Sequence, residues 1–71
     1  MKKAKIDRYI ELSKDYFFNH KISSNELTEK GTEMFGCGSW YRQLIDDLVL
    51  LEKDNETIYK VLHVVGFEIE D

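Results

Sequence analysis

The chain has 71 residues and a net charge of −4 at pH 7. A chain of this length supports one hydrophobic core, so we expect a single domain over residues 1–71. The lone cysteine, Cys37, excludes an intramolecular disulfide and a zinc site with several thiolates, and no apolar run approaches the about 20 residues that span a bilayer. We therefore expect a reduced, cytoplasmic protein, outside the membrane and without a metal or other cofactor.

The first predicted helix carries apolar and aromatic residues at the i, i+3, i+4, i+7 spacing of an amphipathic helix. This face consists of Ile6, Tyr9, Ile10, Ser13, Tyr16, Phe17 and His20. Such a stripe is usually buried, so we interpret it as core packing and not as a binding site.

The second predicted helix begins at Ser24, because the residues around it form a capping box. Ser23 can accept a hydrogen bond from the amide of Glu26, and the Glu26 side chain can return to the amide of Ser23. Gly36 and Gly38 end this helix, because glycine readily takes the positive φ of a tight reversal. Its buried side consists of Leu27, Gly31, Met34 and Phe35.

The third predicted helix covers residues 39–52, with Ser39 as its N-cap. An apolar stripe along it predicts the packing face, which consists of Tyr41, Leu44, Ile45 and Leu48. A second set of residues falls mostly off that stripe and consists of Trp40, Arg42, Gln43, Asp46 and Asp47. This helix therefore has both a packing face and a polar face.

The last third of the chain permits two structures. Its β-branched and aromatic residues favour strands, and these are Thr57, Ile58, Tyr59, Val61, Val64, Val65, Phe67 and Ile69. With residues 53–56 as a polar turn, they predict a β-hairpin and an α+β fold of three helices followed by a wing. The alternative is a fourth helix, capped by Asn55 and stopped at Gly66, in an all-α four-helix bundle.

Two stretches carry a family resemblance, ISSNELTEK (22–30) and SWYRQLIDDLVLLEKDNETIYKV (39–61). In their order they resemble the winged helix-turn-helix superfamily, which implies a winged-helix-like transcriptional regulator that binds double-stranded DNA as a homodimer. The helix over residues 39–52 would then read the major groove, with Arg42 on guanine and Gln43 on adenine. The remaining contacts would go to sugar and phosphate from Ser39, Trp40, Lys53 and Lys60.

The distribution of charge supports a different function. Residues 1–35 hold seven basic and six acidic residues, a net charge of +1, whereas residues 36–71 hold three basic and eight acidic residues, a net charge of −5. An acidic surface in the second half would attract a basic protein partner. The alternative function is therefore a protein-binding module or inhibitor, whose contacts would be Asp46, Asp47, Glu52, Asp54 and Glu56.

No pattern in the sequence indicates an enzyme. Cys37 is not spaced to pair with His20 or His63, either as a nucleophile and base or as metal ligands. We interpret Cys37 as an ordinary loop residue and His63 as a buried, hydrogen-bonded histidine. The aromatic residues to inspect for dimer contacts are Phe17, Phe18, Trp40 and Phe67.

Overall fold

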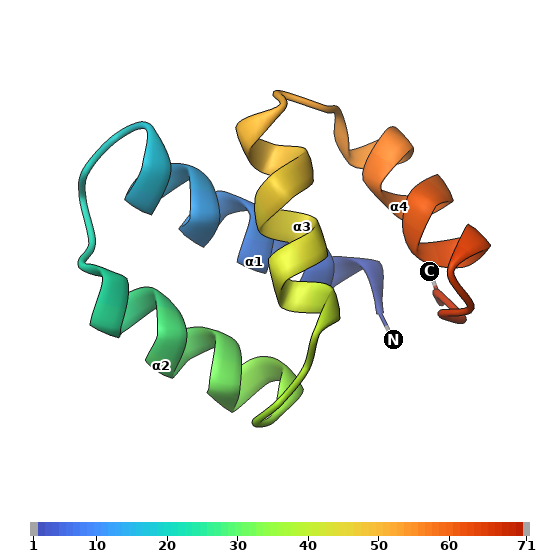
Figure 1. Ribbon diagram of the computed structural model, residues 1–71, viewed down its shortest axis with the longest axis horizontal. Coiled ribbons are helices and arrows are strands. Elements are labelled where there is room, and N and C mark those ends of the chain that lie inside the picture. Colours follow the sequence, from blue (N-terminus) through green and yellow to red (C-terminus); the bar gives the residue numbers. More distant parts are fainter. Residues whose placement is uncertain (1, 71) are drawn as a thin grey trace.

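Residues 2–70 are described by the computed structural model, and they form four helices (Figure 1). The helices are α1 (Lys3–Phe17), α2 (Ser24–Phe35), α3 (Tyr41–Leu50) and α4 (Asn55–Val64). The only extended pairing within residues 2–70 is an isolated parallel bridge between Lys2 and Glu70. The predicted β-hairpin wing is therefore wrong, and the alternative all-α four-helix arrangement is confirmed.

The segment that was expected to pair as strands forms α4 because it has a sound cap and an apolar face of helical period. The Asp54 carboxylate accepts a hydrogen bond from the amide of Thr57 at 3.0 Å, so the cap is Asp54 and not Asn55. Ile58 and Leu62, one helical turn apart, are both completely buried. Burial of that face outweighs the weak strand preference of β-branched residues.

The core lies where α1 meets the other three helices, since α1 contacts each of them (Figure 1). Its buried apolar residues are Ile6, Tyr9, Ile10, Leu27, Ile45, Leu48, Val49, Ile58 and Leu62. The predicted inner face of the first helix is confirmed from Ile6 to Ser13, whereas His20 is exposed in the loop after α1 with a φ of 54°.

Helix α2 begins at Ser24 as predicted, because the Ser23 hydroxyl accepts a hydrogen bond from the amide of Glu26 at 3.1 Å. It packs closely on α1 at Gly31, where an added Cβ would lie 3.0 Å from Cε1 of Tyr9. Alanine would favour the helix intrinsically by about 1 kcal/mol, so the lack of space explains a glycine here.

Helix α3 is shorter than predicted, and its start differs. Ser39 does not cap it; its hydroxyl instead donates to the carbonyl of Phe35 at 2.8 Å and ties the loop to the end of α2. The helix ends at Leu50, and Glu52 takes a φ of 56° in the loop that leads to α4. The predicted reading helix over residues 39–52 is thus reduced to Tyr41–Leu50.

Contacts between residues distant in the sequence hold α4 and the C-terminal segment against α1. Asp7 on α1 accepts hydrogen bonds from Asn55 Nδ2 at 2.7 Å and from the Tyr59 hydroxyl. The amide of Lys3 donates to the carbonyl of Glu70 at 2.9 Å, which places the first turn of α1 beside the C-terminal segment. These contacts fix α4 and the C-terminal segment beside α1.

Candidate protein-binding surface

The residues predicted to read DNA bases make contacts within the chain. Arg42 lies against α2, where its Nη1 donates to Thr32 Oγ1 at 3.0 Å, and it packs over Gly31. Gln43 donates from Nε2 to Oδ1 of Asp47 at 3.0 Å on the exposed face of α3. The two side chains nominated for base contacts therefore point in different directions, and Arg42 has a structural role.

Of the remaining nominated DNA contacts, Ser39 and Trp40 lie within one turn of Arg42 and Gln43, because their carbonyls accept hydrogen bonds from the amides of those residues at 3.2 Å. Trp40 is 58% exposed and lies beside Phe67, with 5.3 Å between ring centroids. Lys53 lies in the loop between α3 and α4, and Lys60 lies on α4. The wing that would have carried both lysines is absent from residues 2–70, where the chain forms α4 instead.

Replacing Arg42 by alanine should lower the free energy of unfolding by about 1 kcal/mol, because it removes a partly buried hydrogen bond and the packing of the aliphatic stem. Urea denaturation followed by circular dichroism would measure the change. Gln43→Ala is the matched control, because Gln43 is exposed and should have an effect within about 0.5 kcal/mol. Equal effects of the two substitutions would contradict a structural role for Arg42.

Asp46 does not belong to an open acidic surface. Its Oδ1 accepts hydrogen bonds from Ser13 Oγ at 2.7 Å and from the Tyr9 hydroxyl at 3.0 Å. Burial raises the pKa of Asp46 above its ordinary value, although both hydrogen bonds oppose the shift. Burial and the neighbouring Asp46 carboxylate raise the pKa of Tyr9 to about 12. Asp46 therefore joins α3 to α1.

The other nominated acidic residues are all exposed and lie between α3 and the first turn of α4. Two leucines lie between Asp47 and Glu52 in the sequence and are also exposed: 48% of the surface of Leu50 and 66% of that of Leu51 is accessible to solvent. We define the α3–α4 patch as the exposed residues Asp47, Leu50, Leu51, Glu52, Lys53 and Asp54, in which three acidic residues outnumber one lysine. Asp47 lies one helical turn before the leucines, because its carbonyl accepts from the amide of Leu51 at 3.1 Å.

A hollow adjoins this patch at the end of α1. It has a volume of about 430 Å³ and includes Glu52, Lys53 and Asp54 of the patch. Its other lining residues are Lys14, Phe18 and Val49, and Phe18 is itself 44% exposed. The patch therefore borders a concave, partly apolar surface that a side chain of a partner could enter.

The sequence also holds a signal for the two exposed leucines, beyond the apolar stripe of the third predicted helix. Residues 48–51 read LVLL, which is four apolar residues in succession. A helix turns 100° per residue, so one side cannot hold all four. Leu48 and Val49 face the core, which leaves Leu50 and Leu51 outside.

The described residues show no other arrangement suited to chemistry. Across residues 2–70, no group of three or more His, Cys, Asp or Glu side chains is placed to hold a metal ion. Cys37 is exposed, and His63 is also exposed, so the interpretation of His63 as buried is wrong. None of the helices in this range is long and apolar enough to cross a membrane.

Comparison of the chain with protein-family models, with curated proteins and with solved structures finds no match.

Proposed function

We propose that this protein is a small helical binding module whose α3–α4 patch recognises a basic, amphipathic segment of another protein. The observation that carries the proposal is the pair of exposed leucines, Leu50 and Leu51, with acidic residues on either side. Burying exposed leucine contributes about 25 cal/mol per Å² of apolar surface removed from water. We place the module in the cytoplasm, where an exposed thiol such as Cys37 stays reduced.

The charges of the patch select the class of partner. Asp47, Glu52 and Asp54 outnumber Lys53, so the patch attracts Lys and Arg side chains. Charges at the rim of an interface mainly accelerate association and exclude partners of like charge. A two-fold dimer through this patch would bring equal acidic groups together, so a second copy fits it poorly. Duplex DNA fits it poorly for the same reason, since its phosphates are anionic.

The first experiment titrates a labelled amphipathic peptide of leucine and lysine against the protein, followed by fluorescence polarisation. Replacing Asp47 and Glu52 together by lysine should weaken binding at least about tenfold, which corresponds to about 1.4 kcal/mol. The matched control replaces Glu29 and Glu33 by lysine, which makes the same charge change on exposed positions of α2. That control should change the affinity by less than about threefold, because distant exposed charges are screened by salt.

Three further arms make the test specific. Leu50→Ser combined with Leu51→Ser should weaken peptide binding as strongly as the charge reversal, because the leucines supply the apolar contact. A peptide with glutamate in place of lysine should not bind. Equal loss of affinity in the α2 control would overturn the proposal, because binding would then depend only on the overall charge. Tight binding of a random DNA duplex that depends on Arg42 would also overturn it and would favour nucleic acid.

A further inference from the structure

The two longest stretches of the sequence without a charged residue are residues 34–41 and 61–67, counting histidine as neutral. They read MFGCGSWY and VLHVVGF. Because 34% of the residues of the chain are charged, a charged residue is expected at about every third position, and both stretches are far longer than that. The fold decides whether they form one surface.

The two stretches meet at the start of α3. The Phe67 ring lies 4.5 Å from the Tyr41 ring and 5.3 Å from the Trp40 ring, measured between centroids. Trp40 is 58% exposed and Val65 is 44% exposed, so this junction stays open to solvent. We define the Trp40 face as Trp40, Tyr41, Val65, Gly66 and Phe67, which come from both stretches.

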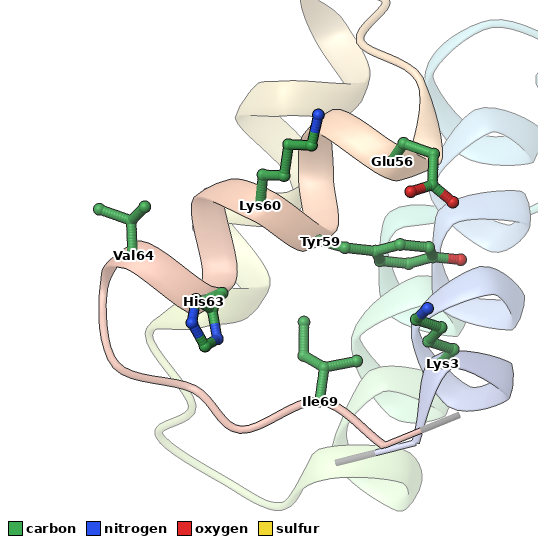
Figure 2. A pocket seen from close by; sticks show the side chains of 7 residues that line it. All are labelled: Lys3, Glu56, Tyr59, Lys60, His63, Val64 and Ile69. Carbon is green, nitrogen blue, oxygen red and sulfur yellow. The ribbon is translucent and has the colours of Figure 1, made fainter.

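The end of α4 adds apolar surface next to this face in the sequence. Val64 is 83% exposed, although valine is usually buried. Its side chain points away from Tyr59 and Ile69, so it does not cover the hollow that those two residues line (Figure 2). Two successive exposed valines thus end α4 beside the aromatic residues of the Trp40 face.

The charged residues around the Trp40 face are mixed in sign. Each uncharged stretch is bounded in the sequence by one acidic and one basic residue, which are Glu33 and Arg42 for the first and Lys60 and Glu68 for the second. Asp47, the first acidic residue of the α3–α4 patch, lies about two helical turns along α3 from Trp40. The net charge of the patch therefore does not extend over the Trp40 face.

The border beyond Tyr41 is also mixed in sign. Lys2 and Lys5 line a hollow of about 460 Å³ there together with Tyr41. Glu70 lies beside Lys2, because the two residues form the isolated parallel bridge. Neither an acidic nor a basic partner is selected by such a border.

This distribution of charge favours a second copy of the chain as the occupant. In a two-fold dimer each residue of the interface lies near its own equivalents, so a face with one dominant charge repels itself. Two copies with a net charge of −4 also repel each other overall. The Trp40 face, which has no charged residue and a border of both signs, adds no repulsion when it meets itself.

We propose that the protein forms a two-fold symmetric homodimer through the Trp40 face. Trp40 and Phe67 are two of the aromatic residues nominated from the sequence for dimer contacts, and aromatic side chains are enriched in protein interfaces. The dimer removes the exposed surface of Trp40 and Val65 from water, which is the main driving force for such association. A chain of this size buries only about 60% of its unfolded surface alone, so the added burial matters for its stability.

Sedimentation equilibrium between about 10 µM and about 1 mM tests the proposal. The 8.4 kDa chain should approach twice its mass at the upper end, with a dissociation constant below about 0.5 mM. Over the same range the amide signals of residues 40–41 and 65–67 should shift in two-dimensional NMR spectra. A monomeric mass at about 1 mM, or shifts centred on Leu50 and Leu51, would overturn the proposal.

Substitutions locate the interface. Trp40→Lys and Val65→Lys each place a charge near its own equivalent in the dimer, so each should weaken association at least about tenfold. Circular dichroism checks that both variants fold; if Trp40→Lys loses structure with its contact to Phe67, Val65→Lys decides alone. The matched control is Leu51→Lys, the same change at an exposed apolar residue of the α3–α4 patch, with an effect below about threefold. Equal weakening by the control would contradict an interface at the Trp40 face.

Salt distinguishes an apolar interface from one held by ion pairs. Raising the ionic strength from about 0.05 M to about 0.5 M screens the repulsion between the two chains, so the dimer should not weaken. A dimer that dissociates in high salt would overturn the proposal. The proposed function fails separately, because it depends on the α3–α4 patch and on a basic peptide whose binding weakens with salt.

Discussion

Replacing Leu62 by alanine is expected to lower the free energy of unfolding by about 3 kcal/mol. Leu62 is completely buried, so the substitution removes its apolar contacts and leaves a cavity in the core. A domain of this size has a total stability of about 4–10 kcal/mol, so the loss is a large fraction of it. Urea denaturation at low temperature, followed by circular dichroism, would measure the difference.

The matched control is Val64→Ala, which removes apolar groups from the same helix at a side chain that is 83% exposed. Its effect should stay within about 0.5 kcal/mol. The pair also separates the two structures weighed for this segment. In a strand with period two, residues 62 and 64 would share a face and both substitutions would be costly. Similar losses at both positions would therefore contradict α4.

Replacing Asp46 by alanine is expected to cost about 2 kcal/mol, because the hydroxyl groups of Tyr9 and Ser13 would lose their acceptor inside the protein. Ser13 is completely buried, so water cannot easily replace the carboxylate there. Denaturation by urea again measures the change. The matched control is Asp47→Ala on the exposed face of α3, which should have an effect within about 0.5 kcal/mol.

Asp46→Asn tests the pKa of Asp46 separately, since an amide oxygen can still accept both hydrogen bonds. Because the folded protein raises this pKa, Asp46 contributes stability below the ordinary value of 3.8 and loses it as the pH rises through the raised value. Asparagine does not titrate. The stability of Asp46→Asn relative to the unaltered protein should therefore increase between about pH 3 and about pH 7. A decrease over that range would contradict the raised pKa.

The sequence predicted the first two helices well because their signals are local. The cap at Ser23 and the positive φ at Gly36 depend on residues within one turn, and both are confirmed. The apolar stripe from Ile6 to Ile10 has a single period that fits only a helix, and it is buried as expected. For such elements, tertiary contacts add stability without changing the local preference.

The last helix was mispredicted because its local preference is nearly balanced. Thr57, Ile58 and Tyr59 fit a pleated surface as well as a helix, and the period of the apolar residues was compatible with both. What decides between them is a partner surface, and α1 and α3 supply one for Ile58 and Leu62. The residue that caps α4 is Asp54, one residue before the predicted cap, Asn55.

The candidate site shows a second limit of sequence patterns. Arg42 and Asp46 both fell off the apolar stripe and were therefore assigned to the solvent-facing side of the helix. In the fold, Arg42 lies against α2 and Asp46 against α1, because α3 has neighbours on more than one side. A polar residue can face a neighbouring helix when hydroxyl groups there complete its hydrogen bonds, as Thr32 and Ser13 do. The apolar stripe of α3 alone does not show which of its polar residues face a neighbouring helix.

Trp40 is the chain's single tryptophan, and it contacts Phe67 in the segment that follows α4. Its emission therefore responds to the local environment of residues 66–70 and only indirectly to the packing of the interior. If that segment detached before the helices melted, the fluorescence signal would change at a lower denaturant concentration than the helical signal. An intrinsic optical probe of the C-terminal segment is thus already present in the protein.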